Sequence, residues 1–167
     1  MFFWVLQAIT PYLVLHVKRK NVDSHHFWYT LMSWQFWAYE SEMRVRYLTN
    51  WADTLNDDEF NEFIATLQGL QVLPQHLWGR PQFAPLGKQY PSIGEIIFKV
   101  ARKQFRVFGF FGAKPMQFIM LHGCGKQRSN LRHEIGLAAR RKNLLEAGQG
   151  TVYAFTIKRR PDRRPSE

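Results

Sequence analysis

Three short apolar runs follow one another between Gly94 and Leu121, separated by polar or turn-forming residues. Runs of this length that contain β-branched and aromatic residues favour strands. The Gly112–Pro115 turn predicts that the strands on either side of it are antiparallel. Phe105–Phe111 is apolar on both faces apart from Arg106, which is typical of a central strand. The pattern therefore predicts a meander with strands near residues 95–101, 104–111 and 116–122.

A helix is predicted over Asp57–Leu67. Asn56 and Glu59 have the spacing of a capping box, in which each residue satisfies a backbone N–H near the other. Apolar residues then recur every three or four positions, and Gly69 is the expected end of the helix. The apolar stripe is interpreted as core, and it consists of Phe60, Phe63, Ile64 and Leu67.

The remaining elements are predicted from shorter signals. Arg44–Leu48 alternates like a first strand, and Pro74–Trp78 has room for a short helix between prolines. Asn130–Leu145 has the pattern of a basic helix with one apolar side. These elements together predict one domain of the α+β class.

The first part of the chain fits none of these patterns. Residues 1–42 are rich in Trp, Phe, His and Tyr, and the apolar stretch Met1–Val17 is too short and too broken for a membrane span. We divide the chain into an atypical extension over residues 1–42, a domain over 43–150 and a basic tail over 151–167. The extension is interpreted as sequence read upstream of a true start at Met43; a membrane-surface or partner-binding segment is the alternative. Residues 1–42 are expected to pack loosely, if at all, on the core.

Charge is distributed unevenly along the chain. The formal net charge is +10, and the cations concentrate in the second half, whereas Asp53–Glu62 contains acids and no base. This polarity favours a partner that is a polyanion, although a solvated basic helix and tail would give a similar count. Cys124 is the single cysteine of the chain, which excludes an internal disulfide and a cysteine-based zinc cluster and fits a cytoplasmic location.

Four segments in this order resemble the RelE/HigB-type toxins of bacterial toxin–antitoxin pairs: Gly94–Lys99, Phe105–Phe111, Leu121–Lys126 and Glu134–Arg141. Arg80–Lys88 is similar to the phage-associated HigB-like branch of that family, and the resemblance covers about residues 43–148. It implies a small antiparallel sheet packed against an N-terminal helix or helical hairpin, with a C-terminal helix. It also implies an mRNA endonuclease, ribosome-dependent in many members, and an antitoxin encoded by the adjacent gene, expected to be a helix-turn-helix protein.

The chain departs from the family pattern at three positions. Ile97 stands where the branch usually has an arginine, Cys124 where it has an aromatic residue, and Gln127 where it has the second of two lysines. Two of these changes remove cations from a phosphate-binding site. They favour an alternative in which the chain is a non-catalytic binding protein of the same fold. A third possibility is a gyrase-poisoning toxin of the ParE-like branch.

RNA cleavage by the neighbouring 2′-hydroxyl needs proton transfer and stabilisation of negative charge on the phosphoryl oxygens, and it needs no metal or cofactor. Arg106 is the candidate for stabilising that charge, because its fork of donors suits a phosphoryl group; the alternative is an ion pair with Glu95 across the sheet. Lys126 is a candidate for charge stabilisation or for a base, and His122 for a general acid. Cys124 is interpreted as a small hydrophobe of a loop.

Further cations are candidates for contacts with mRNA or ribosomal RNA rather than for chemistry. They lie on the second predicted strand, in the turn that follows it, and around the start of the C-terminal helix. The residues are Lys99, Arg102, Lys103, Arg128 and Arg132. No metal site and no membrane contact are expected.

Overall fold

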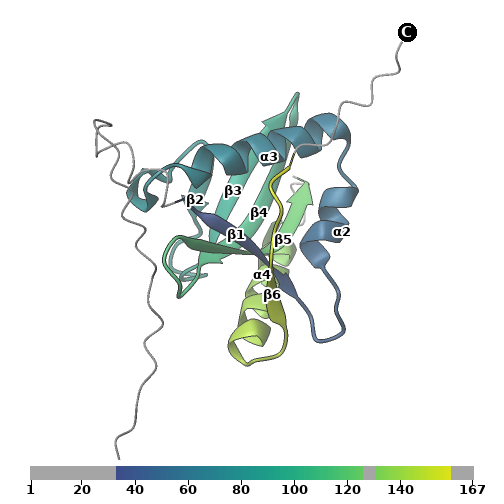
Figure 1. Ribbon diagram of the computed structural model, residues 1–167, viewed down its shortest axis with the longest axis vertical. Helices are drawn as coiled ribbons and strands as arrows, with labels where there is room; N and C mark the ends of the chain where they lie inside the picture. The colour runs from purple at the N-terminus through teal and green to yellow at the C-terminus, as the bar shows by residue number, and fades with distance from the viewer. Residues whose placement is uncertain (1–32, 126–130, 159–167) are drawn as a thin grey trace, which may run out of the picture.

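Six strands form one mixed sheet in the order β2-β3-β4-β5-β1-β6 (Figure 1). The computed structural model describes residues 33–125 and 131–158. The strands are β1 Gln35–Glu40, β2 Phe83–Pro85, β3 Gly94–Val100, β4 Lys103–Phe111, β5 Gln117–Gly125 and β6 Thr151–Ala154. The helices are α2 Tyr47–Asp53, α3 Asp57–Gln71, α4 Leu131–Glu146 and the short 3₁₀ helix η1 Gln75–Leu77.

The predicted meander is confirmed. β4 pairs in antiparallel fashion with β3 on one side and with β5 on the other, so Phe105–Phe111 lies in the interior of the sheet. Val100 pairs with Lys103, which leaves a two-residue turn at Ala101 and Arg102. β5 continues to Gly125 and is longer than predicted. The His122–Gly125 segment is therefore strand rather than loop.

The predicted helix over Asp57–Leu67 is confirmed as the first part of α3. The capping box between Asn56 and Glu59 is complete, because each side chain accepts a hydrogen bond from the backbone N–H of the other. The expected end at Gly69 is wrong, because α3 continues to Gln71. Leu70 is buried in the core, and this burial outweighs the roughly 1 kcal/mol that a glycine costs inside a helix.

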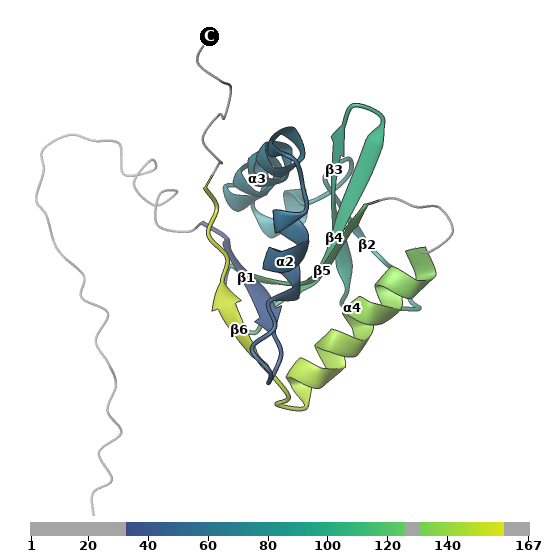
Figure 2. The ribbon, with the colours of Figure 1, turned by 90° about the vertical axis from the view of Figure 1, so that its right-hand side faces the viewer.

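Helices cover both faces of the sheet (Figure 2). α2 and α3 pack on one face, where Phe63, Ile96 and Phe118 belong to the larger hydrophobic cluster. α4 packs on the opposite face, where Phe108, Leu121 and Ala138 belong to a second cluster. The α4 helix was predicted from sequence over almost the same residues; its expected first residue, Asn130, lies outside the described part of the chain.

The predicted first strand at Arg44–Leu48 is wrong, and the first described strand is instead β1. β1 runs parallel to β5 and antiparallel to β6, and the side chains of Trp34, Phe36 and Ala38 are buried in the larger cluster. The expectation that residues 1–42 pack loosely on the core is therefore wrong for residues 34–40. A chain that began at Met43 would lack β1.

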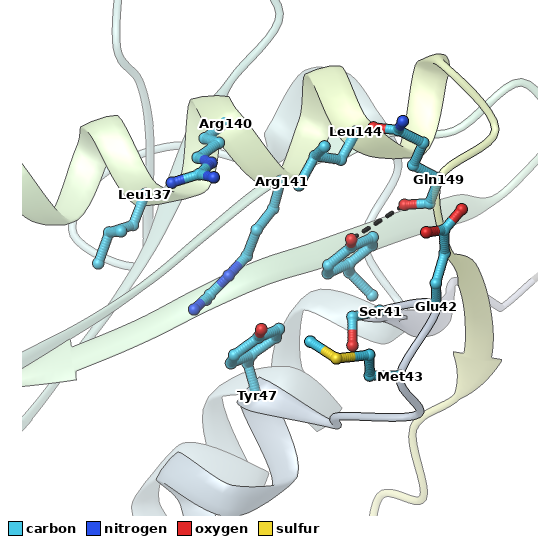
Figure 3. Close-up of a pocket in the computed structure, with 10 residues that line it drawn as sticks. Ser41, Glu42, Met43, Tyr47, Leu137, Arg140, Arg141, Leu144 and Gln149 are labelled. Atoms are coloured by element: carbon cyan, nitrogen blue, oxygen red, sulfur yellow. Dashed lines mark hydrogen bonds between the residues drawn. The ribbon is translucent and has the colours of Figure 1, made fainter.

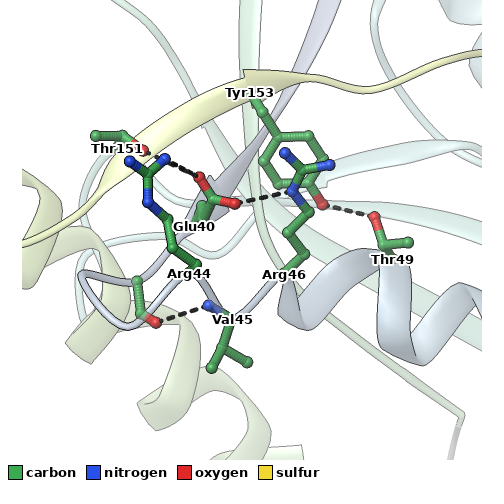
Figure 4. Close-up of polar contacts among 8 residues, drawn as sticks. Glu40, Arg44, Val45, Arg46, Thr49, Thr151 and Tyr153 are labelled. Atoms are coloured by element: carbon green, nitrogen blue, oxygen red, sulfur yellow. Dashed lines mark hydrogen bonds and ion pairs between the residues drawn. The ribbon is translucent and has the colours of Figure 1, made fainter.

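The buried carboxylate of Glu40, at the end of β1, explains why residues 44–46 are not a strand (Figure 4). Arg46 Nε donates a 2.8 Å hydrogen bond to it, and the guanidinium of Arg44 lies 3.6 Å from its other oxygen. The hydrogen bond from Arg46 is the main cause that lowers the pKa of Glu40. Both arginine side chains reach the same carboxylate. The alternation of charged and apolar residues that suggested a strand therefore reflects these two ion pairs.

The C-terminal tail predicted to start at residue 151 also begins inside the fold. Thr151–Ala154 form the edge strand β6, and the Tyr153 hydroxyl lies 2.7 Å from Thr49 Oγ1 of α2. Residues 159–167 lie outside the described part of the chain. The α+β class is thus confirmed, but the sheet is larger than the small antiparallel sheet expected and contains one parallel pair.

Substituting one buried and one exposed position of β1 tests its place in the core. Ala38→Asp puts a carboxylate at a fully buried position and is expected to lower the free energy of unfolding by more than about 3 kcal/mol. Gln35→Asp, at an exposed position of the same strand, is the matched control and should cost less than about 1 kcal/mol. Urea unfolding followed by tryptophan fluorescence measures both. Equal effects would mean that β1 does not contribute to the core.

Candidate functional site

Polar side chains gather on the sheet face that α4 covers. Paired residues of neighbouring strands share a face, so Ile97, Arg106 and Cys124 lie side by side across β3, β4 and β5. The guanidinium of Arg106 donates a short hydrogen bond from one terminal nitrogen to the buried carboxylate of Glu95. Its Nε is buried and has no partner among the described residues. One donor of this arginine is therefore committed to the fold, and another is unsatisfied.

A β-bulge in β5 brings His122 to the same face. The register with β4 shifts between Phe108 and Gly109, because Phe108 pairs with His122 whereas Gly109 pairs with Met120. Leu121 is the extra residue, and its side chain and that of His122 both face α4. Without the bulge, Leu121 and His122 would point to opposite faces of the sheet, so only one of them could reach α4.

Two residues of α4 hold the imidazole from both sides. Arg141 donates to His122 Nδ1 at 2.7 Å, and Glu134 makes a short hydrogen bond with His122 Nε2. An arginine can only donate, so Nδ1 carries no proton and Nε2–H donates to the carboxylate. The ring is therefore neutral, in a single tautomer. Glu134 and Arg141 lie seven residues apart, which places them on the same side of the helix.

Burial is the main cause that lowers the pKa of His122. The hydrogen bond that Nε2–H donates to Glu134 acts in the opposite direction, and the positive charge of Arg141 adds to the lowering. His122 therefore resists protonation while α4 is in place. While α4 packs on the sheet, both ring nitrogens of His122 are hydrogen-bonded. The imidazole therefore has no free donor or acceptor for a ligand.

Cys124 is buried beside this cluster on β5, so it is a core residue of a strand and not of a loop as expected. Desolvation, reinforced by the negative charge of Glu134, raises the pKa of its thiol to about 12. A thiol with this pKa is protonated at neutral pH and is a poor nucleophile. The structure agrees with the interpretation of Cys124 as a small apolar residue.

The predicted RNA-binding cations of the β3–β4 hairpin lie together at its tip. Lys99 and Arg102 are exposed and line an open depression with Gln104 and Gly125. Lys103 belongs to the same tip, but its ammonium makes a 2.9 Å ion pair with Glu59 at the start of α3. Lys103 thus joins the hairpin to the helix, whereas Lys99 and Arg102 extend toward solvent.

The structure brings only part of the predicted site together. Arg106 and His122 share one face, and Arg132 is exposed near the start of α4. Lys126 and Arg128 lie outside the described residues. Sequence analysis missed the roles of Glu134 and Arg141, whose seven-residue spacing on a predicted helix was the available signal.

Within residues 33–125 and 131–158, no group of three or more His, Cys, Asp or Glu side chains could hold a metal ion. In the same ranges, no helix is long and apolar enough to cross a membrane. Comparison of the chain with models of protein families, with proteins of known function and with solved structures gives no match.

The pH dependence of stability tests the assigned state of His122. The pKa of this histidine is lower in the folded than in the unfolded chain. Its contribution to the free energy of unfolding is therefore fully present above about pH 6.5. It is lost as the pH falls from there through the folded pKa, because the unfolded chain takes up the proton first. The His122→Gln variant keeps one hydrogen-bond donor and one acceptor but does not titrate, so its stability should not fall in this way as the pH is lowered. Urea unfolding between about pH 5 and 8 measures both proteins, and identical pH profiles would contradict the assignment.

The accessibility and pKa of Cys124 can be tested with a thiol reagent. Native protein at neutral pH should react with a disulfide reagent at least about a hundredfold more slowly than protein unfolded in urea, because the thiol is buried and protonated. Rapid labelling of the unfolded chain confirms that the reagent is active. Rapid labelling of the native protein would show that β5 opens easily near the bulge.

Proposed function

We propose that this chain is the toxin of a bacterial toxin–antitoxin pair and acts as a metal-independent endoribonuclease on mRNA at the ribosome. The observation that carries the proposal is Arg106, whose buried Nε has no partner among the described residues. It lies on the same sheet face as a histidine held in one tautomer by a carboxylate. An arginine and a neutral histidine on one sheet face can supply the charge stabilisation and proton transfer that cleavage by a 2′-hydroxyl requires.

In the proposed reaction the 2′-oxygen attacks the adjacent phosphorus and the bond to the 5′-oxygen breaks. The products are a 2′,3′-cyclic phosphate and a 5′-hydroxyl. Arg106 donates hydrogen bonds to the phosphoryl oxygens as their negative charge grows. The tautomer of His122 favours a general base instead of the general acid expected from sequence, because Nδ1 is the ring atom that can accept a proton. The proton that Nδ1 takes from the 2′-hydroxyl is then returned to the leaving 5′-oxygen.

Access to this site requires α4 to move. The side chains of Arg106 and His122 are only 13% and 14% exposed, which is too little for contact with an RNA backbone. Displacing α4 would expose Arg106 and would remove both Arg141 and Glu134 from the imidazole, which leaves Nδ1 free to accept a proton. The exposed Lys99 and Arg102 at the hairpin tip are placed to hold phosphates beside the site.

The proposed partner is the antitoxin encoded by the adjacent gene. An antitoxin segment with acidic residues would complement the Arg106 face and the basic side of α4. Such a segment can silence the toxin by covering this face or by fixing the position of α4.

A non-catalytic binding protein is the second candidate, and a specific observation favours it. Ile97, at a position where the related toxins carry a cation, is buried directly beside Arg106. Arg106 is also tied to Glu95, and both nitrogens of His122 are occupied. The contacts of His122 with Glu134 and Arg141 would hold α4 on the sheet even if the chain had no catalytic role.

A pair of substitutions separates a catalytic Arg106 from a structural one. Arg106→Gln alone leaves Glu95 buried without its partner, which destabilises the fold. The double variant Glu95→Gln/Arg106→Gln replaces the ion pair by two neutral amides and is expected to fold. It should lose ribosome-dependent cleavage by roughly 10²–10³-fold, because the preorganised donor is gone. Primer extension on translated mRNA measures cleavage.

Glu95→Gln is the matched control, because it keeps Arg106 and leaves it an amide oxygen as acceptor; circular dichroism checks that this variant folds. It should retain cleavage, with products that end in 2′,3′-cyclic phosphate and with no inhibition by EDTA. Cleavage by the double variant at the wild-type rate would end the assignment of Arg106. A folded wild type that binds the antitoxin and cleaves no RNA would favour the non-catalytic protein.

A further inference from the structure

A groove of about 470 Å³ lies between α4 and the loop that joins β1 to α2 (Figure 3). It is separate from the Glu95–Arg106 pair, which lies over β3 and β4. Arg140 and Arg141 line it from α4, Tyr39 and Tyr47 from β1 and α2, and Glu42 from the loop. Its volume matches that of sites that hold one small organic ligand.

One side of the groove is a stack of planar groups. The rings of Tyr39 and Tyr47 are parallel within 2°, with centroids 6.3 Å apart, and the guanidinium carbon of Arg141 lies 3.9 Å from the centre of the Tyr47 ring. Hydrogen bonds fix two members: the Tyr39 hydroxyl donates to the carbonyl oxygen of Gln149, and Arg141 to that of Leu121. Rigid aromatic and guanidinium planes of this kind stack on nucleobases.

The two ends of the groove carry opposite charges. Arg140 is exposed on α4 and forms no ion pair with another described residue, so its fork of donors is free for a phosphate. Glu42 lies toward the other end, beside Gln149 (Figure 3). A carboxylate there repels an anion and accepts hydrogen bonds from neutral donors such as a ribose hydroxyl or an exocyclic amine.

We infer that this groove binds one nucleoside monophosphate unit, with its phosphate on Arg140 and its base against the Tyr47–Arg141 stack. The unit can be a free nucleotide or the 5′-phosphorylated terminal nucleotide of an RNA strand, since both present the same groups. None of the groups assigned to cleavage lines this site, although the groove exists only while α4 packs on the sheet. Its test measures binding alone, so it does not depend on ribonuclease activity.

Titration of the full-length chain with AMP tests the site. Binding is measured by calorimetry and mapped by amide chemical shifts, which should change at Ser41, Tyr47 and Gln149 and not at the β3–β4 hairpin. Adenosine, without the phosphate, should bind about tenfold more weakly than AMP. Inorganic phosphate alone should also bind more weakly, because it cannot use the stack. A short RNA with and without a 5′-phosphate distinguishes the strand end from the free nucleotide.

Arg140→Gln should weaken AMP binding about tenfold, and Tyr47→Leu should weaken both AMP and adenosine. Arg80→Gln removes the same charge from an exposed position outside the groove and is the matched control, with no effect expected. Circular dichroism confirms that each variant is folded.

Three results would overturn the inference. One is the absence of AMP binding at about 10 mM, a concentration at which even a weak specific site is occupied. Another is unchanged affinity in a folded Arg140→Gln variant. The third is tighter binding of an acetylated Asp-Phe dipeptide than of AMP, which would reassign the groove to an acidic peptide.

Discussion

The parallel pairing of β1 with β5 is the constraint on which the other elements depend. It inserts β1 between β5 and the edge strand β6, so its side chains enter the cores on both faces of the sheet. It also fixes where α2 begins, because the buried Glu40 at the end of β1 holds Arg44 and Arg46. Gly123 of β5 completes the arrangement: a Cβ there would lie 2.1 Å from the Trp51 ring of α2, so only glycine lets this helix pack on the strand.

The opposite face of the sheet is organised by one irregularity in β5. The bulge at Leu121 and His122 turns an imidazole toward α4, where a carboxylate and a guanidinium from one side of the helix satisfy both ring nitrogens. Buried polar groups that are fully hydrogen-bonded specify one arrangement of the elements that carry them. The same contacts therefore position α4 and set the protonation state of the histidine.

The distribution of cations follows from this architecture. Lys103 and Arg106 are bound to acids of the fold, whereas Lys99, Arg102 and Arg140 remain exposed. Among the exposed cations, those at the hairpin tip and those at the groove beside α4 lie at two separate places. An anionic partner that contacted either place would break no internal ion pair, whereas Arg106 is only 13% exposed and is paired with Glu95.

Local patterns by themselves determined the meander, the capping box of α3 and the α4 helix, because each depends on the period of the hydrophobic positions and on residues close in sequence. They failed where distant residues decide the outcome. Gln35–Glu40 is a strand because β5 and β6 supply its partners, and Arg44 and Arg46 bend back because Glu40 is buried. Likewise, sequence identified Arg106 and His122 as candidates, and even anticipated Glu95 as a partner. Only the tertiary structure, through the bulge and the packing of α4, decided which side chains surround His122 and which of its nitrogens carries the proton.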